Sequence, residues 1–267
     1  SCWTAGPGTE RGITIRPTPS PCPMRPRTAA PTWFNLIDTP GHVDFNYEVS
    51  RSLAACEGAL LVVDASQGIE AQTLANTYLA VEHNLEVVPV VNKVDLPSAN
   101  PDMVCHEIED IIGSRRWMHR ASPLKPDSTS NRCSSALSPT SPLPLATPNA
   151  PLQALIFDSY YDSYKGVIVY IRVMHGTVRP GDDILMMATK AQFHVVEVGY
   201  MGATTLVPTD GLSAGEVGYI TASIKSVKDT VVGDTVTLVD APAKQPLDGY
   251  RQVNPMVFCG IYPADGA

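Results

Sequence analysis

The sequence lacks the patterns that mark zinc sites, disulfide-bonded domains and membrane spans. Its six cysteines include no C-x-x-C pair, so neither a zinc site nor a disulfide framework is indicated, and a reducing cytosol suits them best. No apolar run approaches the ~18 residues of a membrane span, and no basic region followed by an apolar one stands at the start. These absences predict a soluble protein.

Positive charge is also scarce. Lysine and arginine number 19 against 27 aspartates and glutamates, which gives a net charge of -8. Such a balance argues against a surface that holds nucleic acid by phosphate neutralisation alone, so an RNA partner would require local basic patches. Hydrophobic residues make up 44% of the 267, enough for a packed core, and the length predicts two domains at roughly 100 to 200 residues each.

Two segments show neither helical nor strand periodicity. Residues 16–32 carry proline at nearly every second position early on, and residues 114–148 are rich in serine, proline and arginine. Proline removes a backbone donor, so we expect neither segment to join a packed sheet. Their origin has two interpretations. One is translation in a wrong reading frame or an error in the gene model, and the other is a natural proline-rich linker.

Between these segments, residues 34–113 alternate between strand and helix patterns. Short apolar runs predict strands, and apolar residues at helical spacing predict helices. Alternating units of this size predict a parallel sheet with helices on both faces, joined by right-handed crossovers. The expected strands are 34–37, 59–63 and 86–91, and the expected helices are 43–58, 69–84 and 101–113.

From Leu152 onward, short strands separated by Gly, Pro and Asp turns replace this alternation. Such a series predicts a small antiparallel β-barrel. A last apolar segment, 254–267, predicts the first strand of a further domain. The strands expected for the barrel are 152–158, 166–173, 182–187, 194–200, 216–223 and 234–239.

Polar residues follow each expected strand of the α/β region. Residues 38–42 (DTPGH) follow the first, Asp64 follows the second, and residues 92–95 (NKVD) follow the third. Ligands of doubly wound sheets bind beyond the carboxyl ends of the strands, so we expect these groups to meet along one edge.

The chemistry of the two motifs suits a nucleotide. Asp38 can reach Mg²⁺ through water, and Gly41 lets its N–H approach a terminal phosphate, although Asp, Pro and Gly are also common in ordinary turns. In NKVD a carboxylate can accept two hydrogen bonds from the ring N–H and amino group of guanine, which selects guanine over adenine. A polar loop is the alternative for NKVD alone. Together, each at a strand end, the motifs favour nucleotide binding.

These motifs, with RGITI at residues 11–15, are similar to those of the translational GTPases. Residues 38–80, 156–173 and 254–263 resemble more specifically the elongation factor 4 (LepA) family. The resemblance covers residues 10–15, 34–113 and 150–267, which is most of the chain.

The resemblance implies roles for individual residues toward GTP and Mg²⁺. Thr14 would be the first-switch threonine on the metal and terminal phosphate, Asp38 the second-switch metal partner, and Gly41 the phosphate sensor. His42 would orient the attacking water when the ribosome docks. Without the resemblance, Thr14 is an ordinary strand residue and His42 a solvated loop histidine.

The residues that would surround the guanine base are Asn92, Lys93, Val94 and Asp95, with the stem of Lys93 packed over the ring; the alternative for Lys93 is a surface lysine.

The resemblance also implies an activity and partners. GTP would be hydrolysed on the ribosome, with contacts to ribosomal RNA and protein, by a factor that acts on elongation through back-translocation or fidelity. We expect a monomer in the cytoplasm with peripheral membrane association, and a mitochondrial or plastid location stays open. The alternative is a remnant that does not hydrolyse GTP and retains only a ribosome-binding barrel.

The sequence departs from the family at the phosphate site. No G-x-x-x-x-G-K-[ST] motif occurs in it, although family members place this loop before the first switch to hold the β and γ phosphates. The family also has a strand ending in Ser-Ala-Lys and a helix after Gly113, where residues 114–148 stand instead. We therefore expect an α/β fold with a partial P-loop-type GTPase domain, impaired in nucleotide binding. Its expected divisions are 1–150 for the incomplete GTP-binding domain, 151–242 for the β-barrel and 243–267 for the start of a truncated third domain.

Overall fold

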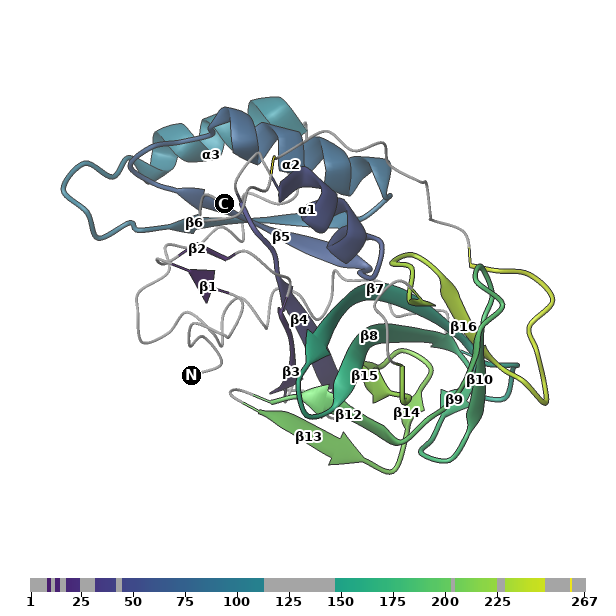
Figure 1. The fold of residues 1–267 in the computed structure, drawn as a ribbon. Coiled ribbons are helices and arrows are strands. Elements are labelled where there is room, and N and C mark those ends of the chain that lie inside the picture. Colours follow the sequence, from purple (N-terminus) through teal and green to yellow (C-terminus); the bar gives the residue numbers. More distant parts are fainter. Residues whose placement is uncertain are drawn as a thin grey trace.

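A computed structural model describes residues 9–10, 13–14, 18–24, 32–41, 45–112, 147–202, 205–224, 229–247 and 260. The chain has an α/β fold in which a layer of helices and parallel strands lies beside a large, curled antiparallel sheet (Figure 1). The predicted class is therefore confirmed at this level. Within the described ranges, no helix is long and apolar enough to cross a membrane.

The α/β layer is built on a pair of parallel strands. Strand β5 (Gly58–Asp64) pairs with β6 (Glu86–Asn92) along its whole length, and helix α2 (Ala71–Glu82) makes the crossover between them. Val63 and Val91 are fully buried in this pair. The predicted strand, helix and strand are all confirmed, because long apolar runs and helical periodicity are the strongest local signals in a sequence.

The helices of this layer pack on one face of β5 and β6, not on both as predicted (Figure 1). Helix α1 (Asn46–Leu53) and α2 cover Ala59 and Val87, and α3 (Pro101–Ile112) covers Val63 and Val91. These strand residues have odd numbers and therefore share one face, since side chains alternate along a strand. In the described part of the chain, only α2 is a crossover between paired parallel strands, and α1 and α3 pack beside it on the same face.

Strand β4 (Thr32–Asp38) lies outside the parallel pair, which corrects the expectation of one sheet. It pairs antiparallel with β3 (Thr18–Met24), from Thr18 opposite Asp38 to Met24 opposite Thr32. The prediction that residues 16–32 could not join a sheet is wrong for β3. Its prolines fall at alternate positions, and alternate residues of a strand direct their N–H groups to opposite edges. The residues between the prolines can therefore bond to β4, while the missing donors lie on the outer edge.

The second part of the chain, for which a barrel was predicted, is one large antiparallel sheet. All six predicted strands are present, and the sheet order is β11-β10-β16-β7-β8-β15-β12-β13. Strand β11, at one end of this order, continues directly through Val195 and Val196 into β12, the strand next to the other end, and the sheet is strongly curled (Figure 1); we call this curled sheet the barrel. The strands are β7 (Gln153–Asp162), β8 (Gly166–His175), β9 (Thr177–Val178), β10 (Asp183–Met186), β11 (Gln192–His194), β12 (Glu197–Met201), β13 (Leu206–Thr209), β14 (Leu212–Ser213), β15 (Val217–Thr221) and β16 (Thr235–Leu238).

Aliphatic side chains fill the barrel. Ile156, Val169, Ile171 and Ile220 have no more than trace exposure and belong to one cluster, which also includes Met186. Alternate residues of the same strands point outward, so the barrel has a second apolar surface.

That outer surface joins the barrel to the α/β layer. Leu155, Phe157, Ile168 and Tyr219 form an apolar cluster with Ala55, which follows α1.

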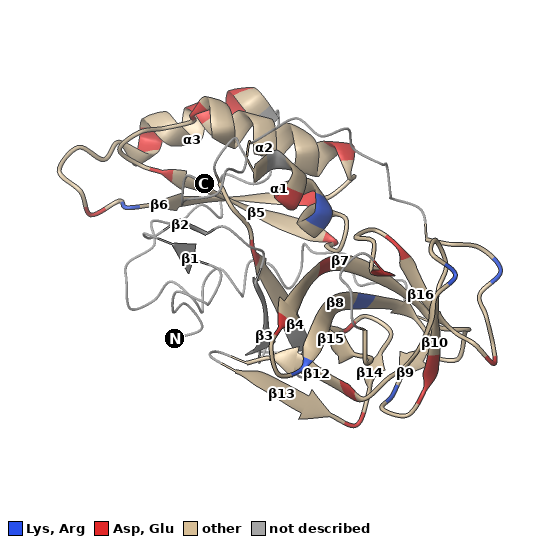
Figure 2. Ribbon diagram, viewed as in Figure 1, with Lys and Arg blue, Asp and Glu red and all other residues tan. Residues whose placement is uncertain are grey.

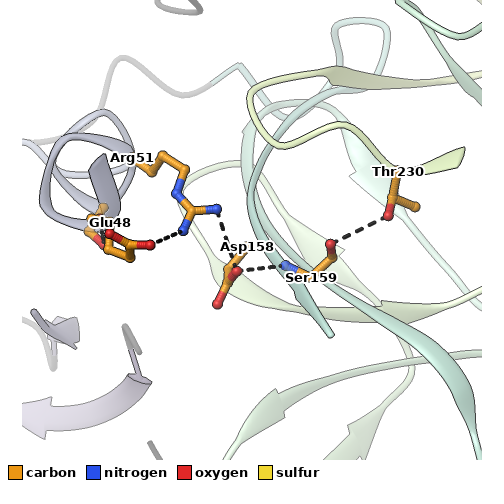
Figure 3. Close-up of polar contacts among 6 residues, drawn as sticks. Glu48, Arg51, Asp158, Ser159 and Thr230 are labelled. Carbon is orange, nitrogen blue, oxygen red and sulfur yellow. Dashed lines mark hydrogen bonds and ion pairs between the residues drawn. The ribbon is translucent and has the colours of Figure 1, made fainter. Parts of the chain in front are cut away.

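Polar contacts reinforce this junction. In Figure 3, Arg51 of α1 extends toward Asp158 of β7, with a distance of 3.8 Å between Nη1 and Oδ1; the guanidinium also approaches Glu48 of its own helix. Asp158 Oδ1 in turn accepts the N–H of Ser159, and Thr230 Oγ1 contacts the Ser159 hydroxyl.

Three sequence-based expectations fall outside the described ranges. They concern His42, the segment 114–148 up to residue 146, and the strand expected within 254–267. A hairpin of β1 (Thr9–Glu10) and β2 (Ile13–Thr14) is described at the level of its backbone.

Candidate nucleotide-binding site

The carboxyl ends of β5 and β6 bring two of the three predicted polar groups together. Asp64 and Asn92 are register partners at the last rung of the parallel pair. The N–H of Ala65 donates to the carbonyl of Asn92 at 2.8 Å, and the N–H of Asn100 donates to the carbonyl of Ala65 at 2.8 Å. The loops after the two strands are therefore fixed to each other, and they form one edge, as predicted. We call this edge, residues 64–66 and 92–95, the rim.

Helix α3 holds the outer part of the first loop. Gly68 has a φ of 73°, which an L side chain rarely adopts, and a Cβ there would lie 2.6 Å from Glu107 Oε2. The same oxygen accepts the N–H of Ile69 at 3.1 Å. Its backbone conformation thus favours glycine at position 68, and a larger residue would also have to displace the end of the Glu107 side chain.

An ion pair crosses the rim. The ammonium of Lys93 lies 2.6 Å from Asp64 Oδ2, while Oδ1 of Asp64 accepts the N–H of Ser66 at 2.8 Å and its hydroxyl at 2.6 Å. These hydrogen bonds, first from Lys93 and then from Ser66, lower the pKa of Asp64 to about 2, and Asp64 raises the pKa of Lys93. Lys93 has a φ of 57°, a left-handed conformation that is uncommon for a residue with a Cβ.

The other residues of NKVD differ in exposure. Asn92 and Asp95 are exposed, so their side chains are available to a ligand. Val94 is half-buried and packs with Val63 and Val104 in the cluster beneath the rim. Burial of Val94 anchors the loop while its polar neighbours stay accessible.

The DTPGH motif follows a different sheet from NKVD. Asp38 ends β4 opposite Thr18, and it is exposed; Gly41 is also exposed, with no atom within 4 Å of the position that a Cβ would take. Because β4 pairs with β3 in a two-stranded sheet that is separate from β5 and β6, the structure does not align Asp38 with Asp64 and Asn92 as adjacent strand ends. Thr14 lies in β2 opposite Thr9, its side chain outside the described part, and His42 is outside it altogether.

The donor chemistry at Asp38 fits Mg²⁺ in a nucleotide complex. Mg²⁺ prefers oxygen ligands, keeps several waters, and is commonly held by one or two carboxylates together with substrate phosphates. A single exposed carboxylate can serve this purpose without a closed cage of side chains. Among the residues that the structure describes, no group of three or more His, Cys, Asp and Glu side chains is placed to hold a metal by itself.

Electrostatics of the described surface agree with the charge count. Figure 2 shows acidic residues spread over the helices and the barrel loops, with basic residues scattered between them. No continuous basic stripe is visible on the part of the chain coloured there. Contacts to a nucleotide at the rim would accordingly be local ones.

Sequence reasoning singled out Asp64 as a strand-end residue but not as the partner of Lys93, and it missed Ser66. The signal was available in part, because Asp-x-Ser after a strand is a common turn in which the carboxylate accepts backbone and hydroxyl donors. The link from Asp64 to Lys93 could not be predicted, because the two residues are 29 residues apart in the sequence and meet only through the register of β5 and β6.

Comparison with known proteins supplies the family context. The model for the elongation factor Tu GTP binding domain matches residues 7–213. An elongation factor 4 from Acetivibrio thermocellus is 61% identical over 258 residues, which are 97% of this chain and 43% of that relative. The one from Ruminiclostridium cellulolyticum is 60% identical with the same coverage, and the one from Geobacillus thermodenitrificans is 54% identical over 97% of this chain and 42% of its own length. The predicted resemblance to elongation factor 4 is confirmed, and the chain spans less than half the length of these curated relatives.

Proposed function

Because the chain belongs to the family of the elongation factor Tu GTP-binding domain, a family of GTPases, we propose that its rim binds the guanine base of GTP in a translation factor similar to elongation factor 4. The observation that carries this proposal is the arrangement of the rim. Asn92 and Asp95 are exposed beside the fixed pair of Asp64 and Lys93, at the carboxyl edge of a parallel sheet where ligands of such folds bind.

Recognition of guanine follows from the chemistry of this loop. The carboxylate of Asp95 accepts hydrogen bonds from the ring N–H and the exocyclic amino group, neither of which adenine offers at these positions. The methylene stem of Lys93 packs against the face of the ring. Val94 packs in the cluster beneath the rim and so fixes the position of the loop relative to the sheet.

The phosphate side of the nucleotide is assigned to the first switch and to DTPGH. Asp38 and Thr14 would hold Mg²⁺, and Gly41 would present its N–H to the terminal phosphate. His42 would orient the attacking water. Mg²⁺, when bound, would supply positive charge to offset the charge that develops on the phosphates. The 267 residues include no G-x-x-x-x-G-K-[ST] motif, so these residues supply the contacts around the base and the metal but not that phosphate cradle.

The wider role proposed is that of the elongation factor 4 relatives: GTP hydrolysis on the ribosome by a cytoplasmic, monomeric factor that acts on elongation through back-translocation or fidelity. Contacts to ribosomal RNA and protein would include the barrel. Peripheral association with a membrane is proposed on the same resemblance. The proposed division of the chain keeps residues 1–150, 151–242 and 243–267 as its three parts.

A second candidate is a module that contacts the ribosome through the barrel and neither binds nor hydrolyses GTP. It is favoured by one observation, the extensive packing of the barrel, in which Ile156, Ile171 and Ile220 are completely buried. Such a core makes the barrel the part of the chain best able to act alone.

A titration with a fluorescent GTP analogue in the presence of Mg²⁺ separates the two candidates. Binding of the analogue at micromolar concentration, with competition by GDP and none by ADP, supports the first candidate and refutes the second. An absence of binding at millimolar analogue refutes the first for this chain. In that case, binding of the chain to ribosomes would be measured by co-sedimentation.

A further inference from the structure

The carboxylate of Asp64 is fully occupied within the rim. One oxygen accepts two hydrogen bonds from Ser66, and the other accepts the ammonium of Lys93 at 2.6 Å. The side chain of Asp64 is only 16% exposed, against 57% for Lys93. Asp64 is therefore an acceptor that is already fixed, and its geometry suits neither a metal ligand nor a group that contacts solvent-borne substrate directly.

The backbone of Lys93 fixes the other end of the pair. Its φ of 57° is uncommon for a residue with a side chain, and its carbonyl accepts the N–H of Leu96 at 3.3 Å in the turn that follows. Lys93 starts from the end of β6, while the atom that holds its ammonium belongs to the end of β5, the neighbouring strand. Parallel strands lie about 4.8 Å apart, which the four methylenes of a lysine can span.

The stem of Lys93 consequently runs across two strand ends with both of its own ends held. Its methylenes are the apolar part of this loop, and Asn92 and Asp95 are exposed on either side of it in the sequence.

We propose that Asp64 is a positioning residue for guanine binding: it holds the Lys93 ammonium so that the lysine stem is laid out for the base before the nucleotide arrives. This inference rests on the proposed function. The benefit is conformational, because a free lysine loses much side-chain freedom when it is immobilised against a ligand. Ion pairs at exposed sites are weak, so the expected contribution is modest, about threefold to tenfold in affinity.

The test measures the affinity of the chain for guanosine, GDP and ADP, by NMR titration of the amide spectra where binding is weak and by competition with a fluorescent GTP analogue where it is tight. The variants are Asp64→Asn, Asp64→Glu, Lys93→Met, and Asp64→Asn combined with Lys93→Met. Glu197→Gln is the matched control. It breaks another lysine pair, with 2.5 Å between Lys165 Nζ and Glu197 Oε1, on the barrel and away from the rim. Amide spectra of every variant establish that the fold is retained.

The expected result is specific. Asp64→Asn weakens guanosine and GDP by the same factor, about threefold to tenfold, and leaves the ratio of GDP to ADP affinity close to that of the wild type. Asp64→Glu keeps most of the wild-type affinity, and Glu197→Gln leaves the affinity unchanged. In the chain that already carries Lys93→Met, Asp64→Asn causes no further loss of affinity. A general loosening of the loop would instead displace Asp95 and reduce the ratio of GDP to ADP affinity.

Two outcomes overturn the inference, and they are distinguishable. If GDP binds the wild type in preference to ADP and Asp64→Asn binds it equally well, the positioning role is wrong while the proposed function stands. If the wild type binds no guanine nucleotide, or binds ADP as well as GDP, the proposed function fails and the positioning role fails with it.

Discussion

Arg172 of β8 is a buried cation that joins the barrel to the α/β layer. Its side chain is 3% exposed; it donates to the carbonyl of Ala55 and pairs with Glu57, both in the segment between α1 and β5. Burial also raises the pKa of the neighbouring Cys56 thiol to about 11, while the positive charge of Arg172 acts in the opposite direction. A charge in this position is retained only because its partners are in place.

Replacement of Arg172 by alanine is expected to destabilise the chain by about 2 to 3 kcal/mol. Removing one partner of a buried pair costs about 3 to 5 kcal/mol, and the cost here is lower because Glu57 is 31% exposed and can be rehydrated. Arg179→Ala, at an exposed arginine, is the control and should change the free energy of unfolding by less than ~0.5 kcal/mol. Urea unfolding checks both; equal effects would contradict the structural role of Arg172.

The lowered pKa of Asp64 makes a prediction about stability at acid pH. Its folded-state pKa of about 2 lies below its ordinary value of 3.8, so the unfolded chain binds this proton more readily. The contribution of Asp64 to stability is therefore complete above about pH 4 and is lost as the pH falls toward 2. The wild type should lose more stability than Asp64→Asn over this interval in urea titrations. Parallel curves for the two proteins would show that the pair does not form in solution.

At the scale of elements, local patterns predicted the strands and helices well, and pairing was the part that failed. The runs that became β5, β6 and β8 are long and apolar, so their period identifies them without a partner. Whether β4 joins β5 or β3 depends on which edge is available, and no local pattern carries that information. The prolines of β3 misled the prediction because their effect depends on which edge of the strand they occupy.

Close packing of β12 against β13 and β15 gives a prediction for the barrel. A Cβ at Gly199 would lie 2.2 Å from the carbonyl oxygen of Val207 and 2.8 Å from the ring of Tyr219. Gly199→Ala should therefore cost about 2 to 3 kcal/mol through overpacking. Gly41→Ala, where nothing lies within 4 Å of the new atom, should change stability by less than about 1 kcal/mol. Thermal unfolding compares the two, and equal shifts would mean that β12 lies farther from β13 and β15 than described.

The contact between α1 and β7 can be tested by a double-mutant cycle on Arg51 and Asp158. Asp158 is 7% exposed, and the Arg51 guanidinium also lies 4.5 Å from the centre of the Tyr47 ring. We expect Arg51→Ala and Asp158→Ala to show a coupling energy of about 1 kcal/mol, because the pair is partly buried but 3.8 Å long. Arg51 with Asp183, an exposed residue of β10, serves as the unconnected control pair. If the effects of Arg51→Ala and Asp158→Ala on the free energy of unfolding are additive, this contact does not stabilise the junction.

At the scale of the whole molecule, the sequence predicted an α/β region followed by a barrel, and the structure has an α/β region followed by a large, curled antiparallel sheet. It also placed NKVD and Asp64 on one edge correctly, since adjacent parallel strands end together. The junction between the two parts could not be predicted. Ala55, Phe157 and Tyr219 are apolar residues in separate elements, and only the folded chain shows that they pack together. The sequence pattern predicted that α1 ends at Gly58, but the helix ends five residues earlier, at Leu53. It ends there because contacts from the barrel fix the segment that follows.

The central claim is that the rim recognises guanine, and exchange of Asp95 tests it most directly. Guanine presents an amino group where xanthine presents a carbonyl oxygen, so Asp95→Asn replaces an acceptor by a donor and should reverse the preference. We predict that the wild type binds GDP about tenfold or more tightly than xanthosine diphosphate, and that Asp95→Asn binds xanthosine diphosphate more tightly than GDP. If the two nucleotides bind the wild type equally, or if Asp95→Asn leaves the preference unchanged, Asp95 does not contact the base and the assignment of the rim is wrong.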